Sequence, residues 1–91
     1  MEKYVSCKEY KFHGHHAKEK IYELENGGRQ IEFWSYSTPM IIRVGGKMYM
    51  NENSYSHSTT RQVNRYMDEE GLRSSNAIFM TEEEMRTLCL W

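Results

Sequence analysis

The sequence has no long apolar stretch, and this absence limits the kinds of protein that it can encode. Only 38% of its 91 residues are hydrophobic, and its mean hydropathy is −0.85. None of its apolar runs approaches the roughly 18 residues that a membrane-spanning helix needs. Residues 1–20 also lack the apolar core of a secretory signal peptide. We therefore expect a cytoplasmic protein with no membrane partner.

Cysteine and proline are scarce. The chain has two cysteines, Cys7 and Cys89, and one proline, Pro39. Because no secretory signal accompanies them, the cysteines do not indicate a disulfide framework, and we expect two reduced, partly buried thiols. No repetitive, proline-rich or glycine-rich stretch marks a linker. The sequence therefore predicts a single small domain that covers residues 1–91.

A large charge of one sign is also missing. The 12 lysines and arginines are balanced by 13 aspartates and glutamates, so the formal net charge is −1 and the pI is about 6.4. Non-specific nucleic-acid binders are usually strongly basic, so this balance disfavours that class. The charges are unevenly distributed, because residues 39–66 are basic and residues 67–91 are acidic. We expect any working surface to lie in the basic part.

Glycine pairs give the clearest local pattern. In residues 40–50, two apolar runs flank Gly45-Gly46. Two glycines satisfy both positive-φ positions of a type I′ turn, which predicts a β-hairpin in which Ile42 faces Tyr49. Apolar residues occur on both faces of this hairpin. Either both faces are covered by other elements, or one face is a binding surface.

Other turn signals predict further strands. Asn26-Gly27-Gly28 favours a hairpin turn before the strand-forming residues 30–36. The segment before this turn, residues 20–25, fits either a strand or a helix. Aromatic residues at even positions favour a strand in residues 3–16, and residues 77–80 have the composition of a short strand.

Two helices are expected in the second half of the chain. Thr59 and Gln62 have capping-box spacing, and we expect this helix to fray or stop early at its acidic C-terminal end, where Gly71 is a plausible terminator. Thr81 and Glu84 form a second capping box, with three glutamates in the first turn of the following helix.

These elements define an α+β fold. We expect an antiparallel sheet of about four strands with a β-hairpin at 40–50, a helix near 59–68 and a C-terminal helix near 82–90. No parallel βαβ unit is visible. The glycine pairs lack a GxGxxG or GKS/T context, so we interpret them as turns and not as phosphate loops.

Residues suited to metal binding or catalysis do not form a convincing constellation. His13, His15 and His16 lie close together, but no second ligand cluster has a spacing that would close a zinc site. His57 lies among serines, yet no nucleophile motif surrounds it. We therefore expect a non-enzymatic protein with no catalytic residues, no metal and no cofactor.

Basic and aromatic side chains in the central part of the chain form the candidate binding surface. Its predicted residues are Arg43, Lys47, Tyr49, Tyr55, Arg61 and Arg65. Arginine and lysine can hold phosphates while tyrosines stack on bases. The same side chains can instead engage an acidic groove on a protein partner, or they can simply be solvated.

Part of the chain resembles short uncharacterised proteins of bacteriophages and mobile elements. The residues that carry this resemblance are Tyr36-Ser37-Thr38-Pro39, Gly46-Lys47-Met48-Tyr49 and the YSHSTTRQVN stretch that begins at Tyr55. Those proteins have a YSYxTP strand, a glycine-turn hairpin and a YSxTT loop that enters a helix. The match covers about a third of the chain. It implies a phage or prophage origin and therefore a bacterial host cytoplasm.

The resemblance also directs the functional expectation. Small phage proteins are often inhibitors of host machinery, anti-CRISPR proteins among them. We expect a binding protein whose partner is a host protein or ribonucleoprotein complex, with inhibition of a host defence nuclease as the leading role. The alternative is a small DNA- or RNA-binding regulatory protein. A homodimer, with Trp91 buried at its interface, is a further arrangement that the sequence leaves open.

Overall fold

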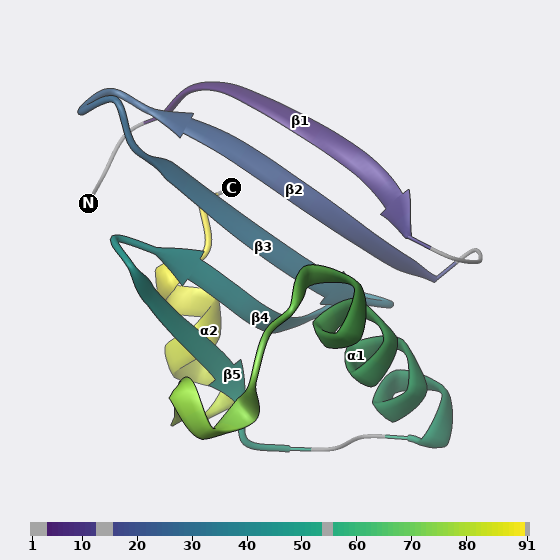
Figure 1. Ribbon diagram of the computed structural model, residues 1–91. Helices are drawn as coiled ribbons and strands as arrows, with labels where there is room; N and C mark the ends of the chain where they lie inside the picture. Colours follow the sequence, from purple (N-terminus) through teal and green to yellow (C-terminus); the bar gives the residue numbers. More distant parts are fainter. Residues whose placement is uncertain (1–3, 13–15, 54–55, 91) are drawn as a thin grey trace.

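The chain forms a six-stranded sheet and two α-helices, seen in a computed structural model that describes residues 4–12, 16–53 and 56–90 (Figure 1). The strands follow the order of the sequence across the sheet, from β1 to β6. The elements are β1 (Tyr4–Phe12), β2 (Ala17–Leu24), β3 (Arg29–Ser35), β4 (Thr38–Val44), β5 (Lys47–Asn51), α1 (His57–Glu70), a 3₁₀ turn (Ser74–Asn76), β6 (Ala77–Met80) and α2 (Glu82–Leu88).

The first five strands form an antiparallel meander, and two of its turns are the hairpin turns that the glycine pairs predicted. The β4–β5 hairpin has the expected register, with Ile42 opposite Tyr49. Gly45 and Gly46 have φ values of 59° and 75°, which suit a type I′ turn and are unfavourable for other residues. The β2–β3 hairpin turns at Gly27, whose φ is also positive at 89°. The ambiguous segment before that turn is therefore a strand.

The sheet is larger than expected, and the absence of a parallel unit was a wrong prediction. The sheet has six strands instead of about four, and β6 runs parallel to β5 after the chain crosses over through α1. Parallel pairing depends on contacts distant in sequence and on a helical crossover. The composition of β6 indicated a strand but carried no information about its partner. The α+β class is nevertheless observed.

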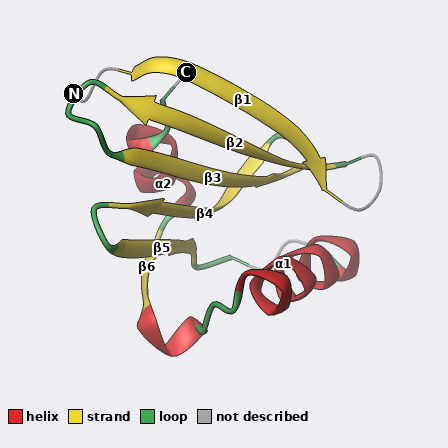
Figure 2. Cartoon of the chain, turned by 45° about the horizontal axis from the view of Figure 1, so that its top comes forward, coloured by secondary structure: helices red, strands yellow, loops and turns green. Residues whose placement is uncertain are grey.

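The two helices cover opposite faces of the sheet (Figure 2). On one face, α1 packs its Val63, Tyr66 and Met67 over Phe33 and the neighbouring strands. The Phe33 and Tyr66 rings stack with centroids 4.2 Å apart. On the other face, α2 places Met85 against a cluster with members Trp34, Ile42 and Cys89. Both faces of the β4–β5 hairpin are thus covered, so the hairpin itself is not an open apolar surface.

The start of α1 differs from the prediction. Ser56 is the N-cap, and its hydroxyl accepts a hydrogen bond of 3.2 Å from the Thr59 backbone. The Ser35 hydroxyl donates a 2.6 Å hydrogen bond to the Gln62 side-chain oxygen and lies 3.1 Å from the hydroxyl of the buried Thr59, within hydrogen-bond distance. The Thr59–Gln62 pair is therefore not a capping box. These two side chains instead hold α1 to the end of β3.

The C-terminal end of α1 does not fray as expected. The helix continues to Glu70, and Gly71 ends it in a left-handed conformation with a φ of 67°. Ion pairs compensate the unfavourable anions, because Glu70 lies 3.0 Å from Arg43. The Leu72 backbone also donates a 2.8 Å hydrogen bond back to Met67. These contacts with residues outside the helix thus outweigh the unfavourable interaction between the helix dipole and the acidic side chains at its C-terminal end.

The predicted capping box of α2 is present. Thr81 accepts a hydrogen bond from the Glu84 backbone, and the Glu84 carboxylate accepts one from the Thr81 backbone. This backbone hydrogen bond lowers the pKa of Glu84 below its usual value. The helix ends at Leu88, slightly earlier than the sequence indicated.

Loss of the Thr81 hydroxyl is expected to destabilise the protein modestly. Thr81→Ala leaves an amide of the first helical turn without its acceptor and should lower the free energy of unfolding by about 1 kcal/mol. Urea denaturation followed by circular dichroism measures this change. Thr81→Ser retains the capping oxygen and serves as the control. Equal losses in both variants would show that the methyl group, not the cap, matters.

One carboxylate lies in the core. Glu32 on β3 is 0% exposed and accepts hydrogen bonds from Gln30, Trp34 and the backbone of Leu90. This arrangement attaches the segment after α2 to the centre of the sheet. Among the described residues, no helix is sufficiently long and apolar to cross a membrane.

Candidate functional site: a basic cavity at the glycine turn

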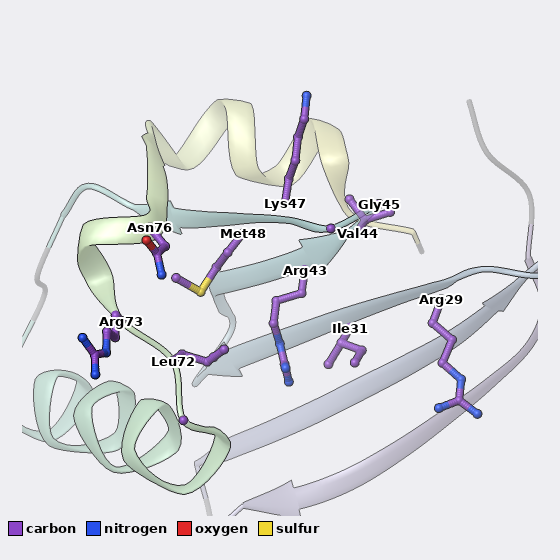
Figure 3. A pocket seen from close by; sticks show the side chains of 12 residues that line it. Arg29, Ile31, Arg43, Val44, Gly45, Lys47, Met48, Leu72, Arg73 and Asn76 are labelled. Carbon is purple, nitrogen blue, oxygen red and sulfur yellow. The ribbon is translucent and has the colours of Figure 1, made fainter.

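A cavity lies beside the Gly45-Gly46 turn, where β3 begins and where the chain leaves α1. Its volume is about 380 Å³. Figure 3 shows the side chains around it. The residues that line it are Arg29, Ile31, Arg43, Val44, Gly45, Gly46, Lys47, Met48, Gly71, Leu72, Arg73 and Asn76. Four of these residues are basic and none is acidic. The cavity is therefore suited to a negatively charged group.

The cations at this cavity differ in how far they are already neutralised. Arg29 forms an ion pair with Glu23 at 2.9 Å, and both side chains are largely exposed. Lys47 and Arg73 are exposed and form no ion pair with any residue that the structure describes. The Lys47 side chain points away from the other lining side chains, so it adds charge to the rim and not to the interior (Figure 3).

Arg43 has a structural role in addition to lining the cavity. Its guanidinium donates a 2.6 Å hydrogen bond to the Tyr66 hydroxyl and lies 3.0 Å from Glu70 and 3.6 Å from Glu19. The Tyr66 hydroxyl in turn donates to Glu19. Burial lowers the pKa of Arg43, but Tyr66 and Glu70 more than offset this effect and raise it. Arg43 is thus held in place and permanently charged.

One donor of this guanidinium remains unused. The Arg43 Nε atom is buried and has no hydrogen-bond partner. A buried donor without an acceptor costs free energy.

The structure brings together only some of the residues predicted to form the binding surface. Arg43 and Lys47 both belong to the cavity. Tyr49 is half-buried on the opposite face of the sheet, in contact with the α2 cluster. Arg61 and Arg65 are exposed on α1, where Arg65 pairs with Glu69 at 3.3 Å. Tyr55 lies outside the described residues.

Two of the four basic residues that line the cavity were not among the predicted binding residues. Arg29 follows the Gly27-Gly28 turn, and Arg73 follows the end of α1. A meander brings alternate hairpin turns to the same end of a sheet, so a correct strand count would have placed Arg29 near the Gly45-Gly46 turn. Arg73 reaches this end only because α1 returns the chain for parallel pairing, and no local pattern encodes that path.

The two cysteines have different environments. Cys89 is buried, and burial raises the pKa of its thiol to about 12, which makes it a poor nucleophile. Cys7 is exposed on β1, contrary to the expectation that both thiols are partly buried. The described residues contain no cluster of three metal-ligating side chains. His13 and His15 lie outside the described residues.

Comparison with known proteins gives no relative from which a function can be transferred. No protein-family model, no curated protein and no solved structure matches the chain. Functional inference therefore depends on the geometry of the chain itself.

Proposed function

We propose that this protein acts by binding an acidic surface of a macromolecular partner and not by catalysis. The observation that carries the proposal is the basic cavity at the Gly45-Gly46 turn, which has no acidic lining residue. Arg73 and Lys47 have no ion-pair partner among the described residues, so their charges are available to a ligand. Exposed arginines on a rigid sheet end provide strong contacts with partner carboxylates.

The more specific form of the proposal is that the partner is a host defence nuclease, which the protein inhibits as anti-CRISPR proteins do. The resemblance of the Tyr36–Asn64 part of the chain to phage and mobile-element proteins supports this role. So does the chemistry of such enzymes, because metal-dependent nucleases hold their ions with clustered carboxylates. A basic cavity complements such a cluster, and the expected place of action is the cytoplasm of a bacterial host.

The cavity proposal predicts that charge reversal weakens partner binding. Arg29→Glu combined with Arg73→Glu removes two exposed cations without touching the Arg43 network. We expect the affinity for the partner to fall at least about tenfold, since each interfacial charge contact contributes on the order of 1 kcal/mol or more. The measurement compares bacterial proteins retained by the tagged wild type with those retained by the variant, followed by target cleavage assays with any captured nuclease.

The matched control applies the same change in charge to α1. Arg61→Glu with Arg65→Glu reverses two exposed arginines outside the cavity. This variant should retain the partner and its inhibition. Retention of the same proteins by wild type and cavity variant alike would exclude the cavity as the contact.

The alternative function, a small DNA- or RNA-binding regulator, rests on Arg61 and Arg65. Both are exposed on α1 and one helical turn apart. Their field is reduced by Asp68 and Glu69 further along the helix. Fluorescence anisotropy with single- and double-stranded oligonucleotides at two salt concentrations decides between the functions. Salt-sensitive binding that the Arg61→Glu, Arg65→Glu variant loses would favour the regulator.

A further inference from the structure

A second site lies at the opposite end of the sheet, where the β3–β4 turn meets the start of β2. Tyr36 occupies this turn with a φ of 56°, and it is the one described residue other than glycine with a positive φ. Two-residue hairpin turns place glycine or asparagine at such positions, because a side chain strains the backbone there. A tyrosine at this position is therefore unfavourable for folding.

The strained tyrosine does not contribute to the core. Its side chain is 48% exposed, and its ring stacks on the His16 imidazole with centroids 4.7 Å apart and planes at 13°. The Tyr36 backbone donates a hydrogen bond to the His16 carbonyl, which fixes the two residues relative to each other. The result is a flat aromatic surface that is held rigidly and faces solvent.

Two lysines with like charge lie beside this aromatic pair. Lys11 on β1 is directly opposite Lys18 on β2. Like charges at opposite positions destabilise a sheet. Two contacts of Lys18 offset the repulsion in part: Glu9 lies 3.9 Å away, and the Lys18 ammonium lies 5.8 Å from the centre of the Trp34 ring.

These features surround a single cavity. A volume of about 240 Å³ is lined by Glu9, Lys11, His16, Ala17, Lys18 and Tyr36. Two separate departures from optimal folding, a strained aromatic residue and a like-charge pair, thus coincide at one place. Such concentrations of unfavourable local structure are typical of functional sites, where a ligand compensates them.

We propose that this cavity binds a nucleotide, with its base stacked on Tyr36 and its phosphate between Lys11 and Lys18. The planar ring accepts a base of any sequence on the face that His16 does not cover. A phosphate between the two ammonium groups replaces their repulsion with two attractive contacts. The formal net charge of −1 disfavours an extended nucleic-acid track, so the ligand is one nucleotide, either free or at a single-stranded end.

This proposal is independent of the proposed partner-binding function. The glycine-turn cavity and the Tyr36 cavity have no lining residue in common, and they lie at opposite ends of the sheet (Figure 1). Variants at one site are expected to leave the other unchanged, so failure of either proposal can be distinguished from failure of the other.

The test uses the full chain and two probes. A fluorescein-labelled, 5′-phosphorylated oligodeoxyadenylate of about 12 nucleotides reports binding by anisotropy. Unlabelled ATP competes for the site and separates a free nucleotide from a single-stranded end as the natural source. The variants are Tyr36→Asn, which suits the positive φ, and Lys11→Glu, which removes the like-charge pair. Lys8→Glu makes the same charge change on the opposite face of β1 and is the control.

We expect Tyr36→Asn and Lys11→Glu each to weaken binding about tenfold, while Lys8→Glu changes it less than about twofold. Thermal denaturation should show that neither site variant is less stable than wild type, because each relieves an unfavourable local feature. Displacement by ATP would identify a free nucleotide as the ligand, and oligonucleotide binding that ATP does not displace would identify a strand end.

Three results would overturn the nucleotide assignment. The first is that wild type binds neither probe, which would leave Tyr36 as a contact for a protein. The second is that Tyr36→Asn binds the oligonucleotide as tightly as wild type. The third is that only the Arg61→Glu, Arg65→Glu variant loses binding, which would assign the activity to α1.

Discussion

Replacing Glu32 with alanine is expected to lower the free energy of unfolding by about 4 kcal/mol, a large part of the total stability of a domain of this size. The carboxylate is fully buried and is the acceptor for three donors, at 2.8 Å from Gln30 Nε2, 3.0 Å from Trp34 Nε1 and 2.8 Å from the Leu90 backbone nitrogen. Alanine removes the Glu32 acceptor from all three donors in a region closed to water, although Gln30 keeps its 2.8 Å hydrogen bond to the Leu88 carbonyl, and it also leaves a cavity.

Glu32 has no ion-pair partner among the described residues, which makes its hydrogen bonds the main compensation for burial. Lys20 is directly opposite Glu32 in the β2–β3 register. Its ammonium group, however, lies 4.7 Å from the centre of the Trp34 ring. A buried anion is tolerated when donors surround it, and here the donors come from β3 and from the segment that follows α2.

Two further variants make the Glu32 prediction specific. Glu23→Ala removes a carboxylate from a largely exposed ion pair with Arg29 and should change stability by less than about 1 kcal/mol. Trp34→Phe removes one of the three donors, so combining it with Glu32→Ala should give a smaller loss than the two single losses added together. Equal effects of Glu32→Ala and Glu23→Ala in urea denaturation would show that the buried network contributes nothing.

Local signals allowed about half of the fold to be predicted. The β4–β5 hairpin was predicted correctly because two adjacent glycines permit only a few turn geometries, and the turn sets the register. The α2 capping box was predicted correctly because both partners lie within one turn of helix. In each case the residues that determine the structure are neighbours in the sequence.

Non-local contacts account for what the sequence did not reveal. The pattern around Glu32 is that of a strand with one polar face, yet the segment after α2 covers that face and buries the carboxylate. Thr59 has the spacing of a capping-box residue, but it is buried and forms a hydrogen bond with Ser35. The pairing of β6 with β5 likewise depends on the path of α1. No window of adjacent residues contains this information.

In the candidate sites too, residues that are neighbours in the sequence were predicted correctly, and contacts between distant residues were not. Sequence reasoning identified Arg43 and Lys47 through their proximity to the glycine turn, but it combined them with Tyr49, which lies on the other face of the sheet. The structure also leaves Tyr36 half-exposed with a positive φ, which no sequence pattern indicated. Backbone strain cannot be read from composition, so the Tyr36 cavity required the structure.

Stability is expected to fall steeply in alkali, by about 5.5 kcal/mol between about pH 8 and about pH 11. Three buried groups cause this loss. Burial raises the pKa of Cys89 from 9.0 to about 12, and burial also raises the pKa values of Tyr22 and Tyr66 above their usual 10.0. Negative charge on Glu32 adds to the effect at Cys89 and Tyr22.

These raised pKa values explain why the free energy of unfolding falls as the pH rises. A raised pKa in the folded state means that the unfolded chain loses its proton first as the pH rises. The stabilisation is complete below the unfolded pKa values, near 9.0 for the thiol and 10.0 for the phenols, and it is lost progressively above them. Each group contributes about 1.4 kcal/mol for each pH unit in that range. Urea denaturation at a series of pH values measures the slope.

Single variants assign the alkaline slope to its sources. Cys89→Ala removes the group that ionises first in the unfolded chain, so the decline should begin about one pH unit higher than in wild type. Cys7→Ala removes an exposed thiol that interacts with Tyr22, and it should leave the onset of the decline at the wild-type pH, because Cys89 sets that onset. If both variants reproduce the wild-type curve, burial of Cys89 does not govern the onset. A Glu32→Gln variant links the two predictions, because loss of the buried negative charge should let the Cys89 thiol ionise at lower pH in the folded protein and so make the decline shallower.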